Sequence, residues 1–290
     1  MCYNISDQGV RKIIKLKRWL LVITLIFSLA TMHCVFATDS IKKPVTVEKG
    51  SMQICIKGSG DKTIVMLSGF GTDNPIEDFA LLSDKLSDKY KIIILEYFGY
   101  GSSDITNKER TNGNIVGEIR IALDKLGITP PYILMPHSMS GLYSLYYAAK
   151  YPSEVSGIIG IDMSLPQKQL ERWKNGDFKE ISQEKSDGLN ISLINQWNKF
   201  YSNSKELENI KYPNKLPVLA FLATEQISSV NDMIKSGNMK TPWIDMNNDM
   251  ITNDNIQIVK VLEGTHYLHH NQADKIFEIS KKFIESKIKN

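Results

Sequence analysis

Short apolar runs alternate with helix-forming stretches along most of this chain of 290 residues. Six runs rich in Ile, Val and Leu are typical of strands covered on both faces in a parallel sheet; they span residues 63–67, 91–95, 132–135, 157–161, 217–222 and 256–261. Helical periodicity predicts helices over residues 76–86, 115–126, 142–150 and 273–288. The alternation predicts an α/β fold with a mostly parallel sheet and helices on both faces.

Two segments depart from this alternation. Residues 45–47 and 52–56 predict a short antiparallel hairpin at a sheet edge. Residues 163–212 have no strand pattern, and their apolar side chains recur every three or four positions, which predicts an inserted helical cap; these side chains belong to Leu170, Trp173, Ile191, Ile194, Trp197 and Phe200. We expect most of them to seat the cap on the main domain, and one or two to line a pocket beneath it.

The first 37 residues differ from the rest in composition. Five basic residues precede an apolar run from Trp19 through Ala37, and Val35-Phe36-Ala37 resembles a signal peptidase site. The run is also close in length to a membrane-spanning helix, so a cleaved signal peptide and a retained membrane anchor are both open. In either case the basic end stays inside, so we expect domain 38–290 outside the cytoplasmic membrane, either secreted or anchored to it.

Charge and cysteine content exclude several classes of function. The leader holds five basic residues and one aspartate, so its net charge is +4. The rest of the chain, whose full formal charge is +3, therefore has a net charge of −1, which gives no basis for nucleic-acid binding. Cys55 is the one cysteine beyond the leader region, so no internal disulfide is expected in a mature chain. The sequence has no CxxC motif and predicts neither a metal site nor a cofactor.

The strongest functional signal is the segment 136–141, Pro-His-Ser-Met-Ser-Gly. It separates a predicted strand from a predicted helix, and a sharp strand–turn–helix connection exposes a serine hydroxyl above the sheet near the helix N-terminus. Ser138 and Ser140 are both candidate nucleophiles, and the small residues Ser140 and Gly141 permit a tight turn. This context predicts a serine hydrolase.

A serine nucleophile needs a base, which is usually a histidine. In the strand–turn–helix arrangement the base follows the nucleophile and the acid in the chain, which excludes His137. His266 directly follows the last predicted strand, at the sheet edge where ligands bind, and is the predicted general base. We expect His269 and His270 at the surface or against the cap.

An oxyanion hole requires two backbone N–H groups. One is expected from Met139, the residue after the nucleophile Ser138. The other is expected from Phe70, because the loop Ser68-Gly69-Phe70-Gly71 follows the first buried strand and its glycines allow a close backbone approach.

The chain resembles the α/β-hydrolase superfamily, in the lid-bearing branch that includes proline iminopeptidases and carboxylesterases. The resemblance extends from about Val45 to the C-terminus and rests on residues 68–71, 96–103, 131–132 and 264–266. The elbow departs from the family's Gly-x-Ser-x-Gly, since Pro136 and Ser140 replace both glycines. A match of His137 and Gly141 to the family's His-Ser-x-Gly-Gly run favours Ser138 as the nucleophile.

The acid has two candidates in the light of this resemblance. The aspartate that usually follows the next-to-last strand is replaced by Gln226, with Glu225 one position away. Asp162 ends the predicted strand 157–161, which is an alternative position for the acid in some relatives. We favour Asp162 over Glu225, although an aspartate there can also simply cap the turn into the cap segment.

These residues predict an exported serine hydrolase that cleaves an ester, amide or lactone of a small molecule through an acyl-enzyme. Epoxide-hydrolase and dehalogenase chemistry is disfavoured, because relatives with those activities place an aspartate at the elbow. Two alternatives stay open: a non-catalytic binding protein on the same fold, and an acyltransferase that uses the same residues.

Overall fold

The computed structural model describes residues 40–176, 179–182, 184, 186, 188–225 and 243–289. The predicted leader, and Gln226, lie outside these residues. Within them no helix is both long enough and apolar enough to cross a membrane.

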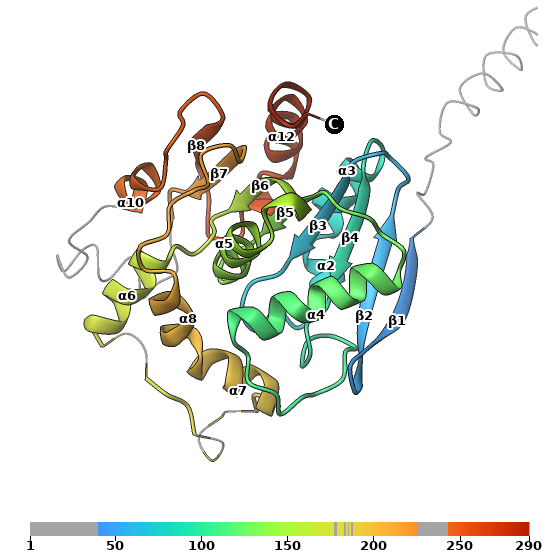
Figure 1. Cartoon of the computed structure of the whole chain (residues 1–290), viewed down its shortest axis with the longest axis vertical. Helices are drawn as coiled ribbons and strands as arrows, with labels where there is room; N and C mark the ends of the chain where they lie inside the picture. The colour runs from blue at the N-terminus through green and yellow to red at the C-terminus, as the bar shows by residue number, and fades with distance from the viewer. Residues whose placement is uncertain are drawn as a thin grey trace, which may run out of the picture. The chain divides into compact units, whose positions relative to one another are not determined.

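The described residues form an eight-stranded sheet with the order β1-β2-β4-β3-β5-β6-β7-β8 (Figure 1). The strands are β1 (Ile41–Val47), β2 (Gly50–Lys57), β3 (Thr63–Leu67), β4 (Lys91–Leu95), β5 (Tyr132–Pro136), β6 (Val155–Ile161), β7 (Val218–Ala223) and β8 (Gln257–Leu262). β2 pairs antiparallel with both of its neighbours, whereas all pairings among β3 to β8 are parallel. The predicted edge hairpin and the six predicted strands are confirmed. Their ends lie within two residues of the prediction, except that β1 begins at Ile41 rather than at residue 45.

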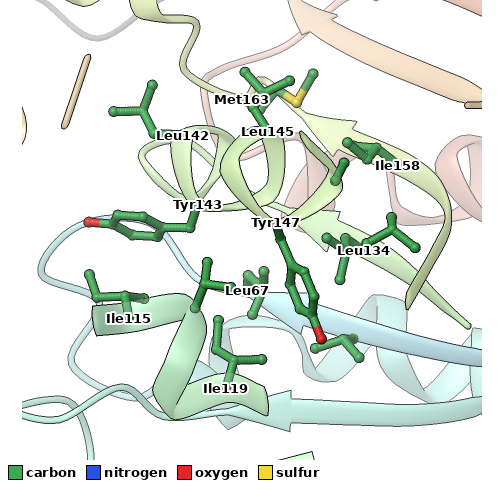
Figure 2. Packing of buried hydrophobic residues seen from close by; sticks show 14 of the residues in the cluster. Leu67, Ile115, Ile119, Leu134, Leu142, Tyr143, Leu145, Tyr147, Ile158 and Met163 are labelled. Atoms are coloured by element: carbon green, nitrogen blue, oxygen red, sulfur yellow. The ribbon is translucent and has the colours of Figure 1, made fainter. Parts of the chain in front are cut away.

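Helices cover both faces of the sheet, so its central strands are buried along their whole length. On one face lie α4 (Asn112–Lys125) and α5 (Ser140–Lys150), and Figure 2 shows their side chains packed against Leu67, Leu134 and Ile158 of the strands. The other face is covered by α3 (Ala80–Ser87) and α12 (Ala273–Lys287). The fold is therefore the predicted α/β arrangement.

The helix predicted over residues 76–86 is wrong in one respect, because it is two helices. α2 (Pro75–Asp78) ends at Asp78, α3 begins at Ala80, and Phe79 lies between them. The backbone turns at Phe79, whose ring is fully buried in the core on this face of the sheet. Burial of this ring provides a physical reason for the break in the helical run.

The cap lies between β6 and β7, as expected. Its helices are α6 (Pro166–Lys174), α7 (Ile191–Asn198) and α8 (Phe200–Glu206), and Figure 1 shows them grouped beside the sheet. α8 contacts both α6 and α7. A further helix, α10 (Trp243–Asp249), precedes β8, and the short α11 (Leu268–Asn271) precedes α12.

Candidate active site

The turn between β5 and α5 holds Ser138 in a strained backbone conformation. Its φ of 51° lies in the left-handed region, which residues with side chains rarely adopt. The turn is fixed on both sides, since the Ser138 N–H donates to Ile161 and its carbonyl accepts from Ser164 at 2.7 Å. Gly141 is required here, because a Cβ at this position would lie 2.4 Å from the Ser164 carbonyl oxygen. These features form the sharp elbow that the sequence predicts.

The two elbow serines differ in their surroundings. Ser138 is partly exposed and lines a cavity of about 190 Å³. Ser140 is fully buried, and its hydroxyl donates to the Ser68 carbonyl and accepts from the Tyr97 hydroxyl at 2.8 Å. The hydroxyl that faces the cavity is therefore that of Ser138.

His266 is paired with Asp162. The distance between His266 Nδ1 and Asp162 Oδ2 is 2.6 Å, and His266 lines the same cavity as Ser138. Asp162 directly follows β6, has a φ of 40°, and is fully buried. Glu225, the other candidate acid, has an exposed side chain, and its backbone N–H donates to the Gly264 carbonyl.

Three groups of the described residues donate hydrogen bonds to the Asp162 carboxylate. Oδ1 accepts from the Ala223 N–H and from the Trp243 indole N–H, both at 3.1 Å, while Oδ2 faces His266. Burial raises the pKa of Asp162, but the His266 hydrogen bond and the charge of Lys168 outweigh it and hold the pKa below its usual range. The group is therefore a carboxylate at neutral pH, and it accepts a hydrogen bond from the Nδ1–H of His266.

The loop proposed for the oxyanion hole lies against the elbow. A Cβ on Gly69 would lie 3.0 Å from His137 Nδ1 and 3.1 Å from Ser138 Cβ, so a side chain at this position would require the elbow to shift. Phe70 and Met139 both line the cavity beside Ser138. The hydrogen bond from Ser140 to Ser68 joins the two segments directly.

The sequence does not predict the role of Ser140. It indicates only a second candidate nucleophile and a residue small enough for the turn. The Ser140 hydroxyl instead connects the elbow to the oxyanion loop, and the buried Tyr97 hydroxyl completes the connection. A serine in place of the family's glycine is the sequence signal, but the partners are brought together only by the fold.

The other histidines of the described residues lie close to His266 or to one another. His137 is fully buried, and its Nε2 donates to the His266 carbonyl at 3.1 Å. Burial, together with the charges of the neighbouring histidines, holds the pKa of His137 well below its usual range, so its ring is neutral. The expectation that His269 lies at the surface or on the cap is wrong: it is 1% exposed, packs against the His137 ring and contacts Asp78.

His270 differs from His269 in exposure but shares its partner. Its Nε2 lies 2.8 Å from Asp78 Oδ1, while His269 Nε2 lies 3.0 Å from Asp78 Oδ2. Burial raises the pKa of Asp78, but its hydrogen bonds and charge interactions with the two histidines lower it overall. Asp78 on α2 therefore anchors the segment that follows His266.

Sequence comparison decides the family. The profile of the α/β hydrolase fold matches residues 62–270, which is most of the chain. The chain belongs to the α/β-hydrolase fold family. The order of Ser138, Asp162 and His266 along this α/β-hydrolase agrees with the order that the elbow motif requires.

Individual relatives of this α/β-hydrolase cover most of its length. It is 27% identical to the uncharacterized protein YbdG of Bacillus subtilis, an alignment that covers 83% of this chain and 84% of YbdG. It is 26% identical to Lipase 3 of a Moraxella species, with 70% and 69% covered. Among solved structures, an epoxide hydrolase mutant of Vigna radiata has a TM-score of 0.64 at 15% identity, with 85% of this chain and 98% of that chain covered.

Proposed function

We propose that this hydrolase is a serine hydrolase that cleaves an ester, amide or lactone of a small molecule through an acyl-enzyme. The observation that carries the proposal is the 2.6 Å pair of His266 and Asp162 on the wall of a cavity that Ser138 also lines. Asp162 holds the proton on Nδ1 of His266, which leaves Nε2 as the base.

The reaction proceeds in two halves. Ser138 Oγ attacks the substrate carbonyl carbon while His266 Nε2 takes its proton, and the N–H groups of Phe70 and Met139 stabilise the oxyanion. The intermediate collapses, His266 returns the proton to the leaving alcohol or amine, and an acyl-serine remains. Water, deprotonated by His266, then attacks the acyl-serine carbonyl; the bond to Ser138 Oγ breaks, His266 returns the proton to this oxygen, and the acid is released.

Ester or amide cleavage fits the elbow better than epoxide opening. The epoxide hydrolase neighbour shows the shared fold alone at 15% identity. Epoxide hydrolases of this fold use an aspartate at the elbow, whereas this chain has Ser138 there. The relative named Lipase 3 is consistent with an ester as substrate.

A fluorophosphonate probe tests the nucleophile. The wild-type protein is expected to become labelled, and Ser138→Ala to lose the label. Ser202→Ala, which removes an exposed cap serine, is the matched control and should label like wild type. Folded protein that takes up no label would contradict the proposal and favour the non-catalytic binding protein.

An acyltransferase shares every residue of this mechanism. In that case an alcohol or amine rather than water takes the acyl group from Ser138. Product analysis with an added alcohol separates the two activities, because a hydrolase yields mainly free acid in water and a transferase yields mainly the new ester.

We also propose that the catalytic domain acts outside the cytoplasmic membrane. The support is the composition of residues 1–37, with basic residues before an apolar run. Cell fractionation with N-terminal sequencing tests it: a start at Thr38 indicates a signal peptide, and a full-length chain in the membrane fraction indicates an anchor. A full-length chain in the soluble cytoplasm would contradict export.

A further inference from the structure

One wall of the active-site cavity is formed by polar and charged side chains of the cap. Arg172 and Gln169 of α6, together with Ser164 before it, line the cavity that Ser138 and His266 also line. Arg172 is 8% exposed and Gln169 is 3% exposed. A guanidinium and an amide are thus largely removed from bulk water beside the candidate nucleophile.

Hydrogen bonds connect this wall to the elbow. The Ser164 N–H donates to the Ser138 carbonyl at 2.7 Å, and Gln169 Nε2 donates to Ser164 Oγ at 2.9 Å. Arg172 Nη1 in turn makes a long hydrogen bond of 3.4 Å to Gln169 Oε1. The guanidinium therefore has a defined position relative to the elbow, and its five N–H donors allow it to bind more than one acceptor.

Lys168 adds a second cation to the same helix, one turn before Arg172. It is buried, and its ammonium lies 3.4 Å from the centre of the Trp243 ring. Burial lowers the pKa of Lys168 to about 8, and the charge of Arg172 lowers it too, whereas Asp162 raises it. Lys168 thus interacts with both the Asp162 carboxylate and the Arg172 guanidinium, and Asp162 also accepts a hydrogen bond from His266.

Aromatic side chains also line the cavity, and the space is small. They belong to Phe70, Trp197 and Phe200, and the Phe70 and Trp197 rings lie 5.1 Å apart. The cavity volume of about 190 Å³ is below the range of roughly 300–1,000 Å³ that is typical of drug-sized ligands. This space suits a short substrate group with an apolar stem and a charged end.

We propose that the substrate is a small ester or amide that carries a carboxylate, and that Arg172 binds this carboxylate. The planar guanidinium matches a carboxylate with two parallel hydrogen bonds, and the partly desolvated cavity strengthens them. This inference rests on the proposed serine-hydrolase function, and it makes Arg172 the residue that determines substrate specificity.

Two matched pairs of chromogenic or spectroscopically followed esters test the inference. In the first pair the charge is on the acyl group: 4-nitrophenyl hydrogen glutarate against neutral 4-nitrophenyl 5-oxohexanoate. In the second pair it is on the leaving group: 4-acetoxybenzoate against 4-acetoxybenzamide. The Ser138→Ala variant gives the background rate, and we expect wild type to prefer the charged member of at least one pair by about 10- to 100-fold in kcat/KM.

Substitution of Arg172 assigns the preference. Arg172→Gln is expected to bring the ratio of kcat/KM between the charged and the neutral ester to about 1, and Arg172→Lys is expected to retain part of the preference because the charge remains. Lys174→Gln, on the exposed side of the same helix, is the control that also removes one positive charge. Equal losses on charged and neutral esters in Arg172→Gln, or no preference in wild type, would overturn the inference.

A binding measurement separates failure of this inference from failure of the proposed function. Glutarate should protect Ser138 from the fluorophosphonate probe better than glutaramide does, and Arg172→Gln should abolish the difference. Labelled protein without this difference would overturn the carboxylate site and leave the serine hydrolase intact. Absence of labelling in folded protein would overturn both.

Discussion

Asp162→Asn is the substitution whose consequence follows most directly from the structure. In the wild type, Oδ1 accepts from the Ala223 and Trp243 N–H groups, and Oδ2 accepts from His266. An asparagine that keeps both Oδ1 bonds must turn its NH₂ group toward His266 Nδ1. The opposite orientation would place that NH₂ group against two N–H donors, so it is disfavoured.

The asparagine therefore imposes the wrong tautomer on His266. Nδ1 becomes an acceptor, the ring proton moves to Nε2, and the nitrogen that should take the proton of Ser138 no longer can. The same substitution in a serine protease triad lowers kcat by about 10⁴, which corresponds to about 5.4 kcal/mol of transition-state stabilisation at roughly 1.36 kcal/mol per tenfold. We expect a loss of similar size here.

Steady-state hydrolysis of 4-nitrophenyl acetate measures this loss. Glu225→Gln is the matched control, because it also neutralises one carboxylate near the end of a strand, and its exposed side chain predicts a change of less than about threefold. Circular dichroism establishes that both variants are folded. An Asp162→Asn protein within tenfold of wild type, or a collapse of activity in Glu225→Gln alone, would refute the tautomer argument.

Four further substitutions test packing and charge, two in the elbow and two elsewhere in the fold. Ser140→Ala removes the hydrogen bonds between the elbow and the oxyanion loop, so we expect about 1–3 kcal/mol less stability in urea unfolding and a lower kcat; unchanged values would contradict this role. Gly141→Ala places a carbon 2.4 Å from a carbonyl oxygen and should lower the free energy of unfolding by about 1–3 kcal/mol. Gly117→Ala lies in helix α4, where the added Cβ would meet no neighbouring atom within 4 Å, and should raise the free energy of unfolding by roughly 0.5–1 kcal/mol. Hydrogen bonds from Arg120 hold the pKa of Glu154 below its usual range. This carboxylate therefore stabilises the fold at pH values above its unfolded pKa of about 4.3. The contribution is lost as the pH falls through the lower pKa of the folded state. Glu154→Gln should therefore cost about 1 kcal/mol at pH 7, with the difference from wild type disappearing in acid-range urea titrations; a difference that persists at low pH would argue against the ion pair.

The fold was predictable because its signals are local. A strand buried on both faces is apolar along nearly its whole length, so Thr63–Leu67 and Lys91–Leu95 are recognisable as apolar runs after their first residue. The break at Phe79 was not predictable in the same way. Helical periodicity continues through it, and the turn depends on how the buried ring packs in the assembled core.

The candidate site was predictable in part. The chemistry of Ser138 and His266 is evident from motifs that are contiguous in the chain, because an elbow and a histidine after the last strand are local features. The partner of His266 is different in kind, since Asp162 lies 104 residues away and Glu225 is nearer in sequence. Which carboxylate faces the imidazole depends on side-chain direction at two strand ends.

The sequence by itself determined the α/β-hydrolase fold and the order of strands, helices and motifs along the chain. It also indicated Ser138 and His266, because hydrophobic periodicity and turn motifs depend on residues that are neighbours in the chain. The tertiary structure decided the contacts between distant segments. It places Asp162 against His266, Ser140 against the oxyanion loop, and Arg172 of the cap on the wall of the cavity. These contacts arise only when the sheet and the cap pack together, and no local pattern encodes them.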